Sequence, residues 1–286
     1  MESHVFRHKY RPSKSNPEKF NIFLCSDLHA DESGFDKELF TRDFDRAKNE
    51  GARININGDL FGCILPSDLK RYSRGNDSGA NTDGKINEAV EKIGELLRPY
   101  VDNIDVIGLG NHETSVLKYH HIDVTRLLLF YLSQFRDKKL TPIRHGGYTG
   151  FIRYSFSTPG GSGRSFDIFY NHGQGGSAEV NDGIADVKRY QYVQADIIWL
   201  GHKHQRWAHE IDPSVGMLHN GRISHKPRFG VMTGTYTKVL SETNATENGY
   251  RINYGEERMR TKQKQGGVRV SLIITKGEPI IPEFTL

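Results

Sequence analysis

Five short apolar runs in this chain are each followed by residues that can bind a metal ion. The runs cover 20–25, 53–57, 104–109, 166–171 and 196–200, and each is short enough for a buried strand. They are followed, in order, by Asp27-Leu28-His29, Asp59, Asn111-His112-Glu113, His172 and His202-Lys203-His204. Loops at the carboxyl ends of strands converge in layered α/β sheets. We therefore expect these side chains to share one site.

The segments around these runs predict the fold class. Helices are expected over 35–50, 86–100 and 113–136, so strand followed by helix occurs three times. The second half is richer in strands, expected at 151–157, 166–171, 196–200, 206–211, 229–236 and 267–274, with one helix near 182–193. This order predicts an α/β protein, specifically a four-layer α/β/β/α sandwich of two stacked mixed sheets with helices outside.

Length and composition favour a single domain. The chain has 286 residues, no repeat and no Pro/Ser-rich linker, and it is long enough to bury one large core. We expect a basic leader over 1–18 and one domain over 19–286. Residues 60–84 are polar, and a loop this long in a compact domain is often functional. Cys25 and Cys63 lie in apolar runs and are expected to be small buried residues rather than a disulfide.

The sequence carries no targeting or membrane signal that we can identify. Residues 1–12 lack the apolar core of a signal peptide, and the run 127–132 is far shorter than the ~20 residues that cross a bilayer. A cytoplasmic protein is therefore expected. The net charge of +4 is concentrated in 1–19 and 256–270, each with five Lys or Arg against two Glu. These segments fit either a polyanion such as nucleic acid or an ordinary solvated surface.

The spacing of the candidate ligands suits a metal site. In Asp27-Leu28-His29 and His202-Lys203-His204, the i, i+2 spacing sends both ligands to one side. A glycine precedes Asp59, Asn111 and His202, where it lets the backbone turn sharply and approach the site. Carboxylates, imidazoles and an amide oxygen form a mixed nitrogen and oxygen set that suits manganese, iron or zinc, and the lack of thiolates argues against structural zinc.

Taken in order, the five motifs resemble the signature of the calcineurin-like metallophosphoesterases. That signature is Asp-x-His, Gly-Asp, Gly-Asn-His-Asp/Glu, a later His, and Gly-His-x-His. In this chain it is formed by Asp27-Leu28-His29, Gly58-Asp59, Gly110-Asn111-His112-Glu113, His172 and Gly201-His202-Lys203-His204. The resemblance covers roughly residues 20–210.

The resemblance implies a role for each matching residue. It assigns Asp27, His29 and His204 to one metal, Asn111, His172 and His202 to the other, and Asp59 to both. It implies that His112 is not a ligand but the proton donor above the phosphate. Two divalent cations, with manganese expected and iron, zinc, nickel or cobalt as alternatives, would activate a bridging water to attack a phosphoester.

The sequence departs from two branches of the family. Phosphoprotein phosphatases carry an Asp three residues after Gly-Asp, followed by Arg, whereas this chain has Gly62 and Cys63 there. DNA-repair nucleases of the family add a capping domain, for which the 82 residues after His204 leave little room. A phosphodiesterase acting on a nucleotide or nucleic acid is therefore expected. A phosphomonoesterase and a nucleic-acid-binding protein with little turnover are the alternatives.

A second basic cluster follows the last motif. Arg222, His225 and Arg228 lie in the segment 212–228, where they could line the pocket and bind phosphate. A basic surface hairpin is an equally good interpretation of the same residues. The sequence makes no prediction about oligomeric state.

Overall fold

Strand β2 (Glu18–Cys25) alternates between two apolar cores and so defines the layers of the molecule. In this computed structural model, Ile22 and Leu24 face a second sheet, while Phe23 and Cys25 face helices. This period-two alternation places successive side chains of one strand on opposite faces of its sheet. The structure describes residues 1–63 except 12, 14 and 33, then 84–158, 163–175, 182–217, 220–238, 245–246, 249–250 and 264–286.

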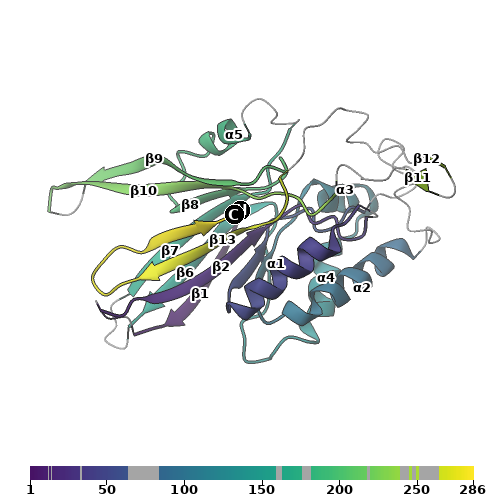
Figure 1. Cartoon of the computed structure of the whole chain (residues 1–286), viewed down its shortest axis with the longest axis horizontal. Helices are drawn as coiled ribbons and strands as arrows, with labels where there is room; N and C mark the ends of the chain where they lie inside the picture. Colours follow the sequence, from purple (N-terminus) through teal and green to yellow (C-terminus); the bar gives the residue numbers. More distant parts are fainter. Residues whose placement is uncertain are drawn as a thin grey trace.

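Two mixed sheets of six strands are stacked face to face (Figure 1). The first sheet has the order β14 (Ile281–Thr285), β13 (Val268–Ile274), β2, β3 (Arg53–Ile56), β4 (Ile104–Ile107) and β5 (Arg144–His145). The second sheet has the order β1 (Glu2–Lys9), β6 (Thr149–Ser157), β7 (Gly163–Asn171), β8 (Ile197–Leu200), β10 (Ile223–Met232) and β9 (Trp207–Met217). Strands β2 to β5 run parallel, as do β7, β8 and β10. A separate short pair joins β11 (Ala245–Thr246) to β12 (Gly249–Tyr250).

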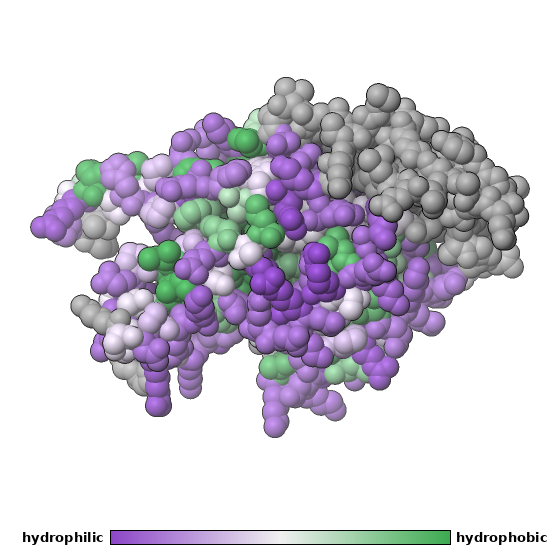
Figure 2. All heavy atoms as spheres, in the orientation of Figure 1, coloured by the Kyte–Doolittle hydropathy of each residue, from purple (hydrophilic) through white to green (hydrophobic). Residues whose placement is uncertain are grey.

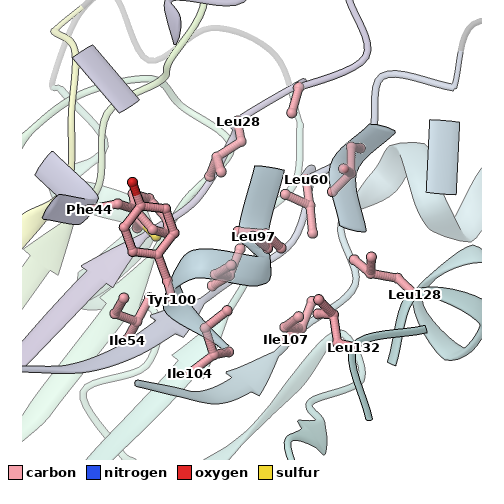
Figure 3. Packing of buried hydrophobic residues seen from close by; sticks show 14 of the residues in the cluster. Leu28, Phe44, Ile54, Leu60, Leu97, Tyr100, Ile104, Ile107, Leu128 and Leu132 are labelled. Carbon is pink, nitrogen blue, oxygen red and sulfur yellow. The ribbon is translucent and has the colours of Figure 1, made fainter. Parts of the chain in front are cut away.

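Helices cover both outer faces. The helices are α1 (Lys37–Asn49), α2 (Lys85–Leu97) with the 3-10 turn Arg98–Tyr100, α3 (Asn111–His120), α4 (Val124–Ser133) and α5 (Ile184–Lys188). The first four α-helices pack on the first sheet around Phe44, Leu97, Leu128 and Leu132 (Figure 3). Helix α5 packs on the second sheet through Val187. The predicted four-layer α/β/β/α architecture is confirmed.

The helix predicted over 113–136 is two helices. His121 has a left-handed φ of 57° and ends α3, and the Asp123 side chain accepts a hydrogen bond from the Arg126 N–H to begin α4. A left-handed residue at this position stops a helix because the next N–H no longer meets the helical carbonyl. The apolar periodicity continues from α3 into α4, so the sequence pattern gave no sign of the break between the two helices.

The residues expected to form a basic leader are partly built into the second sheet. Residues 2–9 form β1, which pairs in parallel with β6 over its whole length. Its alternate residues His4 and Phe6 are buried, while Val5, Arg7 and Lys9 are exposed. The proposed division at residue 18 therefore does not separate a leader from the sheets.

A long hairpin, β9 and β10, extends the second sheet beyond the first (Figure 1). Figure 2 shows apolar side chains on this projecting arm, where Val215, Met217 and Ile223 are exposed. The predicted strand 206–211 covers only the first part of β9, and the predicted strand 229–236 overlaps only the last four residues of β10, which begins at Ile223. Within the described part of the chain, no helix combines the length and apolar character that a bilayer crossing requires.

Candidate dinuclear metal centre

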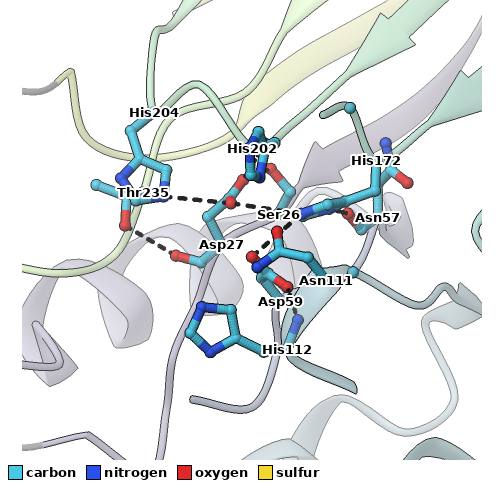
Figure 4. A network of polar contacts seen from close by, with 12 residues as sticks. Ser26, Asp27, Asn57, Asp59, Asn111, His112, His172, His202, His204 and Thr235 are labelled. Atoms are coloured by element: carbon cyan, nitrogen blue, oxygen red, sulfur yellow. Dashed lines mark hydrogen bonds and ion pairs between the residues drawn. The ribbon is translucent and has the colours of Figure 1, made fainter. Parts of the chain in front are cut away.

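Two groups of candidate ligands meet where the parallel strands of both sheets end (Figure 4). One group is Asp27, His29 and His204, and the other is Asp59, His172 and His202. Within each group, the potential ligand atoms lie within 4.8 Å of one another. Asn111 begins α3 beside them, and its buried Oδ1 has no hydrogen-bond partner. The structure therefore brings together all seven residues that the sequence motifs assign to metals.

The backbone is strained at most of these positions. Positive φ angles occur at Asp27 (54°), His29 (47°), Asp59 (46°), His202 (67°) and His204 (53°). Residues with a Cβ rarely adopt this region, and each such residue costs on the order of 1–3 kcal/mol. Five of the eight described non-glycine residues with positive φ are candidate ligands. This concentration of strain indicates a site that the surrounding fold holds in place.

Three glycines allow the ligand turns to pack directly on one another. A Cβ on Gly58, which has a φ of 75°, would lie 2.4 Å from the Gly110 nitrogen. A Cβ on Gly110 would lie 2.1 Å from Asp59 Oδ1, and one on Gly201 would lie 2.6 Å from Ser26 Oγ. The sequence prediction that glycines permit close approach at these turns agrees with this packing.

Hydrogen bonds fix the orientation of two histidine rings. His172 Nδ1 lies 2.7 Å from the Asn57 carbonyl oxygen, and His202 Nε2 lies 3.0 Å from the Gly175 carbonyl oxygen. A carbonyl only accepts, so each of these ring nitrogens carries the proton and donates. The opposite nitrogens, His172 Nε2 and His202 Nδ1, are left as metal-binding atoms. Backbone carbonyls commonly orient metal-binding histidines in this way.

A buried chain of hydroxyl groups orients Asp27. Its Oδ2 accepts from Ser26 Oγ and, at 2.9 Å, from the His202 N–H. Ser26 Oγ lies 2.6 Å from Thr233 Oγ1, to which Trp199 Nε1 donates at 3.1 Å. The other oxygen, Oδ1, has no hydrogen-bond partner and lies 3.3 Å from His204 Nε2. One oxygen of Asp27 is thus held by the fold, and the other is directed at the ligands.

Asp59 belongs to the second group and is held by Glu113. The Glu113 carboxylate accepts backbone hydrogen bonds from Asp59 at 3.1 Å, Phe61 at 2.9 Å and Gly110 at 2.7 Å. It is buried and points at the backbone, so it positions the turns instead of binding a cation. Burial and the neighbouring Asp59 charge together raise the pKa of Glu113 to about 7. Asp59 Oδ2 lies 3.1 Å from His172 Nε2.

The electrostatic field of the site favours positive charge. Burial lowers the pKa of a histidine, yet the carboxylates of Glu32, Asp59 and Asp27 outweigh it and raise the pKa of His29 to about 10. Burial also lowers the pKa of His172, but the carboxylates of Asp59 and Asp27 outweigh it and raise that pKa to about 9. Burial raises the pKa of Asp27, but His204 and His172 outweigh it and lower that pKa to about 2.

The donor set fits divalent cations. Buried ligand atoms without a hydrogen-bond partner include Asp27 Oδ1, Asn111 Oδ1, His172 Nε2 and His204 Nδ1. A buried polar atom left unpaired costs about 1–3 kcal/mol, so a cluster of them requires another binding partner. Carboxylate, imidazole and amide donors match first-row divalent metals. Two such ions, one per group with Asp59 between them, would satisfy these atoms.

His112 lies beside the centre with a different arrangement. Its Nδ1 lies 2.6 Å from the Gly62 carbonyl oxygen, so Nδ1 carries a proton and Nε2 remains available. Its backbone N–H donates to Asp59 Oδ1 at 2.9 Å, and its ring meets the His29 ring edge-on at 4.7 Å between centroids.

The structure does not bring Arg222, His225 and Arg228 to the centre. Arg222 directly precedes β10, and His225 and Arg228 lie within it. This strand has ten residues and spans about 30 Å. Met232, at the far end, pairs with Leu200 next to the ligand turn. Arg228 is buried and donates to the carbonyls of Asp212, Gln191 and Val193. Its guanidinium therefore stabilises the hairpin, and the expected phosphate contact by these three residues does not agree with the structure.

Several residues that shape the site were not predicted from the sequence. Ser26 and Asn57 contact Asp27 and His172 directly, and Thr233 and Trp199 support Ser26 from distant parts of the chain. The position of Glu113 inside the Gly-Asn-His-Glu motif was the one available signal, although no role was assigned to it.

Comparison with models of protein families gives no match, and comparison with curated proteins gives none either. Comparison with solved structures does give matches. Calcineurin-like phosphoesterase YfkN from Bacillus subtilis is 14% identical, with 94% of this chain and 90% of that chain covered and a TM-score of 0.40. A metallophosphoesterase from Sphaerobacter thermophilus is 13% identical, with 90% and 84% covered and a TM-score of 0.33.

A third match is Vps29 from Entamoeba histolytica, a structure in complex with zinc. It is 11% identical, with 93% of this chain and 98% of that chain covered and a TM-score of 0.35. At these TM-scores, the chemistry of the site has to be argued from its own residues. The solved structures that are similar to this chain include calcineurin-like phosphoesterases, the superfamily that its five motifs resemble.

Proposed function

We propose that this protein is a metal-dependent phosphoester hydrolase that acts on phosphodiesters of nucleotides or nucleic acids. The observation that carries the proposal is the pairing of two ligand groups around Asp59 with a neighbouring histidine, His112, whose Nδ1 is tied to a backbone carbonyl. A cation pair and a separate proton donor are the two components that phosphoester hydrolysis requires.

The residues of the chain divide the work of the reaction between them. Two divalent cations, when bound, would polarise the phosphoryl oxygens and lower the pKa of an attacking water. The Ser26 hydroxyl donates to the Asp27 carboxylate, and the Glu113 carboxylate accepts from the Asp59 N–H, so both aspartates are held in fixed positions for binding cations. His112 Nε2 delivers a proton to the leaving-group oxygen while Nδ1 stays hydrogen-bonded to the Gly62 carbonyl. This assignment keeps the ring oriented throughout proton transfer.

The surroundings of His112 favour a diester substrate. Gly62 stands three residues after Asp59, where the related phosphoprotein phosphatases carry an Asp, and Cys63 stands where they carry an Arg. That Arg would bind the extra negative charge of a phosphomonoester. A diester carries one charge fewer, so its binding depends less on that Arg, while its alkoxide leaving group still needs a proton donor such as His112. Both features fit the site as it stands.

The metal proposed is manganese, with iron, zinc, nickel and cobalt as alternatives. Nitrogen and oxygen donors together, without thiolate, suit ions between magnesium and zinc in character. The proposed nucleic acid or nucleotide partner draws on the basic residues of 1–19 and 256–270, of which 256–263 lie outside the described residues.

The experiment is a metal-supplemented activity screen with two variants. The wild type is assayed with Mn²⁺ on bis-nitrophenyl phosphate, nitrophenyl phosphate, cyclic nucleotides and single- and double-stranded DNA and RNA. We expect diesters to be cleaved faster than monoesters. The His112→Asn variant should keep both metals and lose about 10²–10⁴-fold in turnover, most for poor leaving groups. His120→Asn, exposed at the far end of the same helix, is the matched control.

Two results would contradict the proposal. Faster cleavage of a phosphoserine peptide than of every diester would reverse the substrate class. Loss of metal from His112→Asn would show that this residue is a ligand and not the proton donor.

A further inference from the structure

The turn after His29 contributes a carboxylate that the proposed chemistry does not yet use. Glu32 Oε1 lies 3.3 Å from His29 Nδ1, and the Glu32 side chain is 18% exposed. His29, Glu32 and His112 form a third group whose potential ligand atoms lie within 4.8 Å of one another. Glu32 thus lies against both a candidate metal ligand and the proposed proton donor.

The backbone opposite Glu32 leaves room for this carboxylate. A Cβ on Gly62 would lie 2.3 Å from Glu32 Oε1, so a larger residue at position 62 would displace the carboxylate. The same glycine accepts from His112 Nδ1 at 2.6 Å. Asp31 holds the turn because its two oxygens accept from the Gly62 N–H at 2.5 Å and the Cys63 N–H at 2.9 Å. Asp31 therefore fixes the backbone whose carbonyl orients His112, and the carboxylate of its neighbour Glu32 packs against the same glycine.

We propose that Glu32 is a positioning residue that holds His29 in its metal-binding orientation and places a negative charge beside His112. The role of Glu32 toward His112 rests on the proposed function, whereas its role toward His29 requires only that the centre binds metal. A carboxylate at one ring nitrogen of a metal-binding histidine fixes the ring and directs the other nitrogen at the cation. With Nδ1 facing Glu32, His29 presents Nε2 to the group that contains Asp27 and His204.

The effect on His112 follows from charge. Glu32 lies within 4.8 Å of a potential ligand atom of His112 and packs against the Gly62 backbone whose carbonyl holds that ring, so its carboxylate places a negative charge directly beside the imidazole. The Gly62 carbonyl fixes the direction of the ring but carries no full charge. Glu32 therefore supplies, from a different part of the chain, the negative charge that phosphoprotein phosphatases place at the position of Gly62.

The test uses the full-length protein with Glu32→Gln, Glu32→Asp and Gly62→Ala. Glu38→Gln, which alters an exposed glutamate at the start of α1, is the matched control. Mn²⁺ affinity is measured by titration calorimetry, and turnover is compared on diesters with nitrophenyl and with alkyl leaving groups. Glu32→Gln should still bind two ions but lose about 10–100-fold in affinity for one of them, the usual effect of removing such a partner. Its turnover at saturating metal should fall more for the alkyl than for the nitrophenyl leaving group.

The companion variants separate positioning from folding. Gly62→Ala should reproduce the changes of Glu32→Gln because it displaces the carboxylate without touching a ligand, and Glu32→Asp should recover part of both effects. Unchanged affinity in Glu32→Gln, or equal losses for both leaving groups, would overturn the inference. If the wild type cleaved no phosphoester, the proposed function would fail, and the affinity measurement would still decide the role of Glu32 toward His29.

Discussion

Two pairs of histidines in this protein are held in the interior, yet their surroundings give them opposite preferences for a proton. His29 and His172 lie at the metal centre, where neighbouring carboxylates outweigh burial and raise their pKa values to about 10 and about 9. His4 and His8 lie on the inner face of β1, where burial dominates and lowers the pKa of each. Burial thus lowers the pKa of His4 and His8, whereas at His29 and His172 the neighbouring carboxylates outweigh it.

The difference teaches what kind of site the centre is. His8 packs among the rings of Phe20, Tyr154 and Phe156, and the one carboxylate that acts on it, Asp105, is already paired with Arg53. At the centre, by contrast, Asp27 and Asp59 lie among imidazoles, and among the residues that the structure describes neither carboxylate is paired with a Lys or Arg. Near His8, Arg53 thus neutralises the Asp105 carboxylate, whereas the carboxylates of Asp27 and Asp59 have only histidines beside them. Divalent cations are the charges that the donor atoms of the centre would bind.

Replacing the shared carboxylate should produce the largest effect. Asp59→Asn removes the charge that most raises the pKa of His172, so that histidine should become more like His4. We expect the variant to bind at most one ion. Its activity should fall by more than about 100-fold, the loss expected when a residue that only orients a metal ligand is removed. Elemental analysis and NMR titration of His172 measure both effects. Asp212→Asn, on the exposed hairpin, is the control, and two retained ions of unchanged affinity would refute the assignment of Asp59.

Removing the metal should destabilise the protein in a pH-dependent way. In the metal-free protein, the raised pKa values of His29 and His172 contribute stability that is complete below 6.5 and is lost as the pH rises through about 9 and about 10. Bound cations supply this charge at any of these pH values, and at 1,000 times the Kd they add about 4 kcal/mol. Thermal unfolding with Mn²⁺ or with EDTA should therefore differ more near pH 9 than near pH 6. An equal or reversed difference would contradict the account.

Acid should act on the other pair, with a smaller effect. The lowered pKa values of His4 and His8 contribute stability that is present above 6.5 and is lost as the pH falls through the folded-state values. His8→Leu removes a buried Nε2 that has no hydrogen-bond partner, so it should stabilise the protein by about 1 kcal/mol at neutral pH. Urea unfolding between about pH 5 and pH 7 should show a shallower loss of stability in the variant. A steeper loss, or reduced metal binding, would show that the two regions are not independent.

Strands β2, β3 and β4 of the first sheet could be predicted from the sequence because their signals are local. The short apolar run of β2 and the helical spacing of apolar residues in α1 are both visible within a few residues. Strand β1 was missed for the opposite reason. Its inward positions include His4 and His8, which look polar in a sequence, and His8 lies between Arg7 and Lys9. Only the partner strand β6 and the apolar layer beneath make that segment a strand.

For the candidate site too, local signals could be predicted from the sequence, whereas contacts between distant segments could not. The ligands could be predicted because each directly follows an apolar run, and strand ends converge in this class of fold. The residues that orient the ligands could not, because their contacts join distant segments, as in the Ser26 to Thr233 contact across 207 positions. Arg228 shows the converse. Its proximity to the last motif in the sequence suggested a phosphate contact, but the strand direction carries it away from the centre toward three carbonyls of the hairpin region.

The central claim is that two cations bind on either side of Asp59, and crystals grown with Mn²⁺ test it most directly. Anomalous scattering at the manganese edge should give two peaks per chain. One should lie among Asp27, His29 and His204, and the other among Asn111, His172 and His202, with Asp59 between them. A single peak, a peak elsewhere on the chain, or a ligand set that includes His112 would contradict the account.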